Sequence, residues 1–219
     1  MDDLAVNELN RFDKVAGMYD RLASLVFGKS IRAAHTECLE RVPDEGNIVV
    51  LGGGTGWWLP AFLQNHPRCH VYYIEASKKM IELARANLGE LNRVEFLHAT
   101  EDVLDQIDLQ FDAVITCFYL DLFSEQQLAK ATSMIHRRLN PGGRWCVADF
   151  VCDRWWHNAI LHVMYSFFRA VGACDTGELP AWRKALGEMR MKLLWDCDYY
   201  GGFIWSLVLE KAPGRQHIL

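Results

Sequence analysis

A buried-type β-strand runs directly into a glycine-rich turn at Val49-Val50-Leu51-Gly52-Gly53-Gly54-Thr55-Gly56. Glycine in such a turn lets the backbone approach a ligand closely, because no Cβ atom stands between them. In parallel sheets, ligands bind beyond the carboxyl ends of the strands, which is where this turn lies. Tight turns use the same residues for purely structural reasons, so a ligand site needs support from the rest of the chain.

Residues 47–150 around this turn alternate short apolar, β-branched runs with helical patterns. A helix that is capped by Ser77 is expected to stop at Gly89. Ser124 and Gln127 form a capping box for a second helix, which should end at Asn140-Pro141-Gly142. Strands that alternate with helices form βαβ units and therefore a parallel sheet. Five strands are predicted, at residues 48–51, 70–75, 94–98, 111–117 and 144–149.

The end of the chain departs from this alternation. Two strand-like runs, at residues 193–199 and 203–209, are joined through Gly201-Gly202, and two glycines supply the positive φ angles of a tight hairpin. The pair should therefore be antiparallel. We predict an α/β fold: a Rossmann-like, doubly wound, mostly parallel sheet of seven strands whose last strand is antiparallel.

We predict one domain over residues 1–219. Its segments are an N-terminal helical cap (4–42), a cofactor-binding core (47–150), a helical substrate lid (153–190) and the terminal β-hairpin (191–211). The helix expected at residues 155–168 is apolar nearly all round, so it must be buried or line an apolar pocket. A packing lid, a dimer interface and shallow membrane contact remain alternatives to a substrate wall. The protein is expected to be a monomer or a homodimer.

The overall charge argues against nucleic acid as a partner. The 219 residues carry a net charge of −5 and no block of Lys or Arg, whereas binding to a phosphate backbone needs a concentrated basic face. The acidic N-terminus lacks the apolar core of a secretory signal, and no apolar stretch reaches the ~20 residues that span a bilayer. Seven scattered cysteines without a CxxC pair predict neither a disulfide framework nor a zinc ribbon. We expect a cytoplasmic protein that acts on a small molecule.

A metal site at His66, Cys69 and His70 is not expected. Pro67 breaks the helix between the two histidines, and successive side chains of a strand that starts at Cys69 point to opposite faces. A solvated turn that enters the second strand explains these residues better.

Glu75 ends the second predicted strand, about 20 residues beyond the glycines, where a carboxylate can accept hydrogen bonds from both hydroxyl groups of a ribose. A nucleoside ligand is therefore expected. Trp57 stands where a dinucleotide fingerprint has its third glycine, which disfavours an NAD(P)-dependent oxidoreductase and leaves it as the alternative. A sulfonium cation would be favoured by aromatic faces, which Tyr19, Trp57, Phe118 and Tyr119 offer.

Four motifs in order along the chain resemble those of the class I S-adenosylmethionine-dependent methyltransferases. They are Gly52 to Gly56, Glu75, Phe111-Asp112-Ala113-Val114 and Leu139-Asn140-Pro141-Gly142-Gly143. The opening residues 12–22 look like the N-terminal helix of the ubiquinone/menaquinone C-methyltransferase-like branch, in which a tyrosine, here Tyr19, lies over the cofactor. The resemblance extends from Phe12 to Lys211 and is weakest in the insertion.

The resemblance implies S-adenosylmethionine as cofactor and S-adenosylhomocysteine as product. The glycines would line the methionine part of the cofactor, Glu75 would hold its ribose, and residues around Met80 and Thr100 would contact its adenine. Residues 117–119 would form the wall between cofactor and acceptor. The implied cofactor-binding residues are Tyr19, Gly52, Gly53, Gly54, Thr55, Gly56, Trp57, Glu75, Ala76, Met80, Thr100, Glu101, Cys117, Phe118 and Tyr119.

Two departures from the family pattern leave a degenerate, non-catalytic cofactor-binding module as a further alternative. The family has an acidic residue two positions before the first glycine of the turn, where this chain has Val50. It also has an aspartate on the adenine side, where this chain has Thr100, although the neighbouring Glu101 or Asp102 can take that role.

We expect transfer of a methyl group to a small, hydrophobic or aromatic acceptor at oxygen, carbon or nitrogen. A sulfonium is an excellent leaving group, so catalysis comes mostly from alignment in a dry site, and a general base is needed only if the acceptor must lose a proton. Asp149 and His157 are the expected catalytic residues, with Asp121 and His98 as further candidates. A capping role is the alternative for Asp149. The expected substrate-binding residues are Tyr119, Arg154, Trp155, Trp156, His157 and Leu161.

Overall fold

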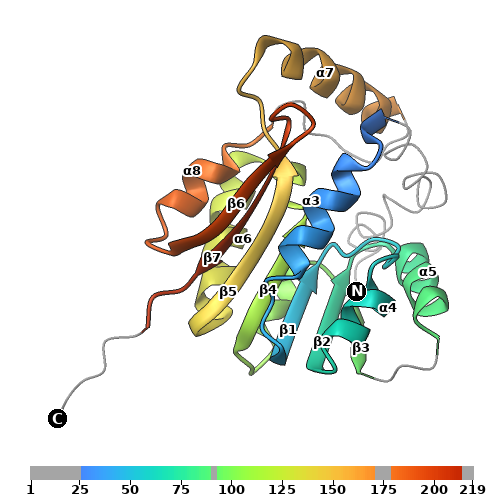
Figure 1. Ribbon diagram of the computed structural model, residues 1–219, viewed down its shortest axis with the longest axis vertical. Helices are drawn as coiled ribbons and strands as arrows, with labels where there is room; N and C mark the ends of the chain where they lie inside the picture. Colours follow the sequence, from blue (N-terminus) through green and yellow to red (C-terminus); the bar gives the residue numbers. More distant parts are fainter. Residues whose placement is uncertain (1–25, 90–92, 171–178, 214–219) are drawn as a thin grey trace.

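The computed structural model describes residues 26–89, 93–170 and 179–213, which form a seven-stranded sheet with helices on both faces (Figure 1). The strand order is β3-β2-β1-β4-β5-β7-β6. The first five strands are parallel, and β7 pairs antiparallel with both β5 and β6. The predicted fold class is therefore confirmed. The strands are β1 (Glu45–Leu51), β2 (Arg68–Glu75), β3 (Val94–His98), β4 (Phe111–Cys117), β5 (Leu139–Phe150), β6 (Lys192–Tyr199) and β7 (Ile204–Glu210).

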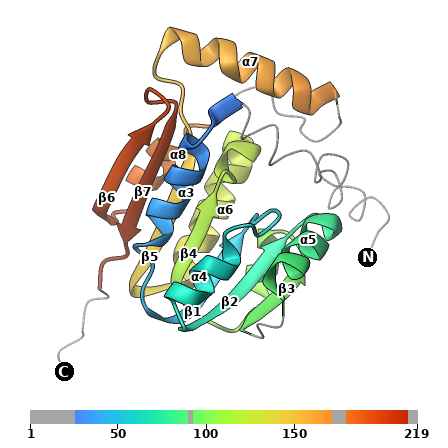
Figure 2. The ribbon, with the colours of Figure 1, turned by 45° about the vertical axis from the view of Figure 1, so that its right-hand side comes forward.

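Two helical layers cover the sheet, and each buries its own apolar cluster (Figures 1 and 2). One layer comprises α3 (Ser30–Leu39), α4 (Leu59–Asn65) and α5 (Lys78–Leu88). The other comprises the 3-10 helices η2 (Glu101–Asp105) and η3 (Leu120–Leu122) with α6 (Glu125–Arg138) and α8 (Trp182–Gly187). Helix α7 (Trp155–Ala170) lies across the top of the molecule, beyond the end of β5.

Local sequence signals set the starts of two helices. Ser77 caps α5 because its hydroxyl oxygen accepts the backbone N–H of Met80 at 3.1 Å, and the helix stops before Gly89 as predicted. Ser124 and Gln127 form the predicted capping box at the start of α6, in which each side chain satisfies a backbone N–H of the other residue.

The end of α6 differs from the prediction. The helix stops at Arg138, and the Asn140-Pro141-Gly142 segment that was expected to end it belongs to a strand. Leu139 already pairs with Phe111 at the start of β4, so β5 begins as soon as the helix is complete. A pairing between residues so far apart in the sequence overrides the local turn signal.

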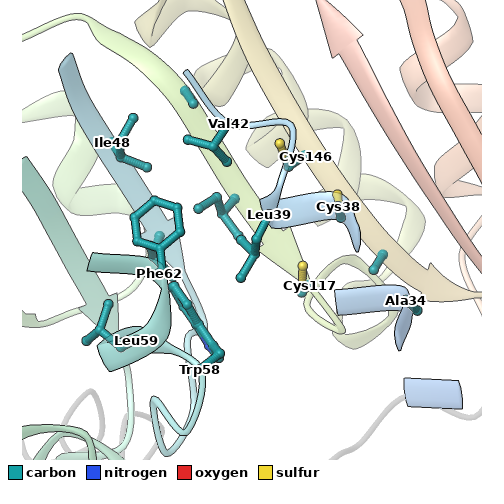
Figure 3. Close-up of a cluster of buried hydrophobic side chains, with 14 of the residues drawn as sticks. Ala34, Cys38, Leu39, Val42, Ile48, Trp58, Leu59, Phe62, Cys117 and Cys146 are labelled. Atoms are coloured by element: carbon teal, nitrogen blue, oxygen red, sulfur yellow. The ribbon is translucent and has the colours of Figure 1, made fainter. Parts of the chain in front are cut away.

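Helix α3 packs against β7 and forms hydrogen bonds with it. The hydroxyl group of Ser206 in β7 donates to the backbone oxygen of Ala34 at 2.9 Å, and Cys38 Sγ donates to the backbone oxygen of Leu207 at 3.6 Å. Figure 3 shows Cys38 above the sheet, on the side of Cys117, in a core shared with the apolar side chains of α4. This core therefore joins the first described helix to the end of the described chain.

In the parts of the chain that the structure describes, no helix is long and apolar enough to cross a membrane. The predicted cap at residues 4–42 is described only from residue 26 onward, so its first part lies outside the described residues. The assignment of the whole chain to one domain stays a prediction.

A hydrogen bond between two fully buried side chains joins β4 to β5. Trp145 Nε1 donates to Thr116 Oγ1 at 2.9 Å. We expect Trp145→Phe to lower the free energy of unfolding by about 1–3 kcal/mol, because the Thr116 hydroxyl loses its partner in a dry site. Chemical denaturation measures the change. Thr116→Val is the matched substitution, and the double variant should lose less stability than the sum of the single variants; strict additivity would contradict the assigned role of this bond.

Candidate active site

A pocket lies at the carboxyl ends of β1, β2 and β4, and helices α3 and α7 also contribute to its lining. The sequence-predicted cofactor residues gather around it with two exceptions. Gly56 is not part of the lining, and Tyr19 lies outside the described residues. The predicted residues that line the pocket are Gly52, Gly53, Gly54, Thr55, Trp57, Glu75, Ala76, Met80, Thr100, Glu101, Cys117, Phe118 and Tyr119.

The glycines of the turn differ in role. Gly54 has a φ of +64°, and a Cβ atom placed on it would meet nothing within 4 Å, so this position adjoins open pocket space. A Cβ atom on Gly53 would lie 2.2 Å from the ring of Tyr73, whose hydroxyl group donates to the backbone oxygen of Gly54 at 2.9 Å. Gly56 allows the turn to pack closely on α5, because its Cβ atom would lie 2.8 Å from that of Ala84.

Glu75 ties the glycine-rich turn to the start of α5. Its Oε2 accepts the backbone N–H of Gly54 at 2.9 Å, and its Oε1 accepts that of Ser77 at 2.9 Å. Burial raises the pKa of this carboxyl group, and the N–H groups of Ser77 and Gly54 oppose the rise. A carboxylate oxygen has two lone pairs, so Glu75 keeps the capacity to accept ribose hydroxyl groups as well.

Tyr119 and Glu101 join two parts of the pocket wall. The hydroxyl group of Tyr119 donates to Glu101 Oε2 at 2.7 Å. Burial and the Glu101 carboxylate raise the pKa of Tyr119 well above its usual value, so the phenol keeps its proton. The contact connects the turn after β4 to η2, the region that the family resemblance assigns to the adenine.

Asp149 stabilises the turn after β4 and is not part of the pocket lining. Its Oδ2 accepts the backbone N–H groups of three successive residues, Tyr119 at 3.2 Å, Leu120 at 2.9 Å and Asp121 at 3.2 Å, and its Oδ1 accepts that of Phe150 at 2.8 Å. The side chain is fully buried. The structure therefore favours the capping alternative over the catalytic role that was predicted for Asp149.

The part of helix α7 that lines the pocket differs from the part that the sequence predicted. His157 is fully buried, its ring lies 5.2 Å from that of Phe203 at the β6–β7 hairpin, and its Nδ1 accepts the backbone N–H of Asp153 at 3.2 Å. The α7 side chains that line the pocket, Met164 and Tyr165, come later in the helix. The lining excludes the predicted substrate-binding residues Arg154, Trp155, Trp156, His157 and Leu161, so their expected role is not supported.

The pocket also contains residues that sequence reasoning missed. Helix α3 contributes Ile31, Arg32 and His35. The ring of Trp57 lies 4.9 Å from the Arg32 guanidinium and 5.5 Å from the His35 ring, so α3 holds this aromatic side chain in place. Phe150 at the end of β5 adds a further aromatic ring. Nothing in the spacing of the α3 residues reveals that this side of the helix reaches the turn after β1.

Cys117 places a buried thiol on the pocket wall, with Cys38 nearby (Figure 3). A hydrogen bond with Cys38 lowers the pKa of Cys117 to about 5, with further help from His35 and against the effect of burial. Burial raises the pKa of Cys38 well above its usual value.

The residues considered for a metal site near the start of β2 make other contacts. His66 stacks on Phe62 with ring centroids 4.5 Å apart, and Cys69 Sγ donates to the backbone oxygen of Pro43 at 3.3 Å. Among the residues that the structure describes, no group of three or more His, Cys, Asp or Glu side chains is arranged to hold a metal ion.

Comparisons with known proteins agree with this geometry. Residues 48–143 match the family described as a methyltransferase domain. The demethylmenaquinone methyltransferase of Clavibacter sepedonicus is 34% identical over 142 residues, which cover 64% of this chain and 56% of that relative. Over this region the chain is similar to the class I S-adenosylmethionine-dependent methyltransferases. The ubiquinone/menaquinone biosynthesis C-methyltransferase UbiE of Haemophilus ducreyi is 27% identical to this chain over 190 residues, 83% of this chain and 73% of the relative.

The region that the first of these relatives shares with this chain spans little more than half of the relative's length. Among solved structures, the N-methyltransferase NodS from Bradyrhizobium japonicum WM9, in complex with S-adenosylhomocysteine, has the same fold. The TM-score is 0.59 at 17% identity, over 82% of this chain and 86% of that chain.

The pocket residues fit S-adenosylmethionine, the cofactor of this family. Gly54 leaves space where a side chain would stand, Glu75 offers acceptors to ribose hydroxyl groups, and Trp57 offers an aromatic face to a cation. When bound, the cofactor supplies a methyl group that is activated by the positive charge on sulfur. The chain's own residues would bind it, orient it and exclude water from it.

We expect Glu75→Ala to weaken the binding of S-adenosylhomocysteine by about 1.5–3 kcal/mol, the range for hydrogen bonds to a charged group. Glu75→Gln, which keeps one carbonyl oxygen, should lose less. Calorimetric titration measures both, and Glu95→Ala on the exposed side of β3 is the matched control. Unchanged affinity in folded Glu75→Ala protein would contradict the assignment of Glu75 as the acceptor for the ribose hydroxyl groups.

We expect Gly54→Val to abolish cofactor binding, because its side chain enters the open space beside the turn. Valine at positive φ also strains the backbone, by about 1–3 kcal/mol. Gly89→Val separates the two effects, since Gly89 has a φ of +68° and equally open surroundings but lies after α5, outside the pocket lining. Calorimetry should show normal binding for Gly89→Val only. Equal losses in both variants would mean that strain, not occupied space, explains the result.

Proposed function

We propose that this methyltransferase transfers a methyl group from S-adenosylmethionine to a ring carbon of a small, hydrophobic acceptor of the hydroquinone type. The names of the relatives support a carbon acceptor in a quinone-like ring: one is a demethylmenaquinone methyltransferase and the other a C-methyltransferase of ubiquinone/menaquinone biosynthesis. A small molecule in the cytoplasm is thus the proposed partner, and the net charge of −5 gives no support to nucleic acid.

The observation that carries this proposal is the aromatic wall of the pocket. Phe118 and Phe150 pack with their ring centroids 5.2 Å apart, and Met164 and Tyr165 of α7 line the same pocket. A flat apolar ring binds such a surface through edge and offset contacts, and its burial adds hydrophobic stabilisation. A charged acceptor would lose its hydration there without gaining hydrogen bonds or an ion pair in exchange.

The pocket can act on such an acceptor mainly through position. Phe118 adopts a φ of 55°, which is rare for a large side chain, and its backbone N–H donates to the oxygen of Ala148 at 2.6 Å. The surrounding sheet therefore fixes the start of the turn after β4, where the wall begins. A fixed wall can hold an acceptor ring in line with a methyl group, and alignment of that kind lowers the barrier by several kcal/mol, of order 7–11 in well-oriented model reactions.

We expect the purified protein to convert 1,4-dihydroxynaphthalene, kept reduced under nitrogen, to a product with one additional methyl group on a ring carbon. Mass spectrometry detects the added methyl group, and NMR spectroscopy distinguishes a new C–C bond from a new O–C bond. Naphthalene without hydroxyl groups should not react, because its ring carbons are too weakly nucleophilic. Glu75→Ala protein is the control for cofactor-dependent turnover.

The other outcomes separate the rival functions. Binding of S-adenosylhomocysteine without turnover of any hydroquinone, phenol or amine would identify a non-catalytic cofactor-binding module. Turnover of amines alone would refute the hydroquinone assignment and leave the methyltransferase in place. Tight binding of NAD or NADP would favour the oxidoreductase alternative, which the position of Trp57 in the glycine-rich turn disfavours.

A further inference from the structure

Asp121 is a pocket residue with an unusual environment. It lies in η3, directly after the turn that Asp149 stabilises, and it lines the pocket although only 7% of its surface is exposed. Its Oδ1 is shielded from solvent and has no hydrogen-bond partner among the described residues. A buried acceptor without a donor is costly, so such an atom in a native structure calls for a ligand or another explanation.

Asp121 also interacts with a second buried carboxyl group. The Asp149 carboxyl group acts on the pKa of Asp121, and two neighbouring carboxyl groups resist ionising together. Burial raises the pKa of Asp121 to about 7, and burial together with Asp121 raises the pKa of Asp149 well above its usual value. Asp121 is the member of the pair that lines the pocket.

The other charged groups of the pocket do not contribute to the pKa shift of Asp121. Among the described residues, Asp149 is the one other side chain that acts on the pKa of Asp121, alongside burial and the Asp121 backbone. The other titratable or charged side chains that line the pocket are Arg32, His35, Glu75, Glu101, Cys117, Tyr119 and Tyr165. Glu101 accepts from Tyr119 and Glu75 accepts from two backbone N–H groups, whereas Asp121 Oδ1 is shielded and has no hydrogen-bond partner among the described residues.

We propose that Asp121 is the base that accepts the proton of the acceptor's ring hydroxyl group, an assignment that rests on the function proposed above. The acceptor supplies the donor that Oδ1 lacks. The O–H bond then breaks, its electron pair stays on the ring oxygen, and the proton passes to the Asp121 carboxylate. The resulting phenolate raises the electron density on the adjacent ring carbon, which is the atom that receives the methyl group. That carbon then loses its own hydrogen as a proton to solvent and the ring becomes aromatic again. The ring oxygen takes back the proton that Asp121 holds, so one proton is released overall.

The first test measures binding rather than turnover. The complex of the 219-residue chain with S-adenosylhomocysteine is titrated with 1,4-dihydroxynaphthalene by calorimetry at several values between about pH 5 and about pH 9. In the wild type, affinity should rise as the pH rises through about 7, because ionised Asp121 is the better acceptor. Asp121→Asn should bind about tenfold or more weakly at high pH and lose this dependence. Its affinity for S-adenosylhomocysteine should not change.

Asparagine suits this test because it has nearly the shape of aspartate and keeps the backbone N–H that donates to Asp149 Oδ2, so the turn after β4 should persist. Asp121→Ser, which is smaller, is the second variant if asparagine disturbs folding. Asp108→Asn is the matched control, since Asp108 is exposed and precedes β4 at the opposite end of the strand.

The second test uses acceptors of graded acidity. Asp121→Asn should reduce kcat for 1,4-dihydroxynaphthalene by about 100-fold or more, the usual contribution of a general base. The loss should shrink for halogenated hydroquinones, because an acceptor that is already ionised needs no base. A residue with a merely structural role would lower the rate for every acceptor equally.

Two results would overturn the assignment and can be told apart from failure of the proposed function. If the wild type binds and methylates the hydroquinone but Asp121→Asn keeps its affinity and its pH dependence, Asp121 is not the base. Loss of the same pH dependence in His35→Gln instead would move that role to α3. If the wild type neither binds nor methylates any hydroquinone, the proposed function fails, and the assignment to Asp121 fails with it.

Discussion

The carboxylate of Asp149 accepts hydrogen bonds from three successive backbone N–H groups, and the wall of the pocket beyond β4 depends on this interaction. The chain leaves β4 through Phe118 in a left-handed conformation, which turns the next three N–H groups toward the end of β5. Without an acceptor there, these groups would be buried and unpaired, at a cost of about 1–3 kcal/mol each. Glu75 has a similar role at the end of β2, where it bonds to the backbone of Gly54 and Ser77.

Most of the fold could be predicted because its determinants are local. Alternating strands and helices indicated the parallel sheet, and Gly201-Gly202 indicated the antiparallel hairpin. The end of α6 could not be placed in the same way. The turn-like sequence Asn140-Pro141-Gly142 predicts a break, but the pairing of Leu139 with Phe111 makes it part of a strand. Such a pairing depends on the register of two strands, which a single sequence does not reveal.

The candidate site shows the same division between features set by local sequence and features set by long-range packing. The half that contains Gly54 and Glu75 belongs to one strand–turn–helix unit and the next strand, so spacing in the sequence was enough to predict it. The other half depends on how α3 and α7 rotate as they pack. A helix that is apolar nearly all round does not indicate which side faces a pocket. The sequence pattern therefore favoured His157 as a pocket residue, whereas Met164 and Tyr165 are the α7 side chains that line the pocket. Likewise, the sequence does not reveal how many backbone N–H groups surround Asp149, because that number depends on the pairing of β4 with β5.

The contact between α3 and β7 has a consequence for how the molecule is made. During synthesis, β5 leaves the ribosome long before β7, its antiparallel neighbour, so one edge of the growing sheet stays open until residues 204–210 have been made. Helix α3 cannot dock fully before that edge is closed, because the backbone oxygen of Ala34 accepts the hydroxyl group of Ser206 in β7. A nascent chain can therefore form the glycine-rich turn early, yet it acquires a complete active site only when β7 has joined the sheet.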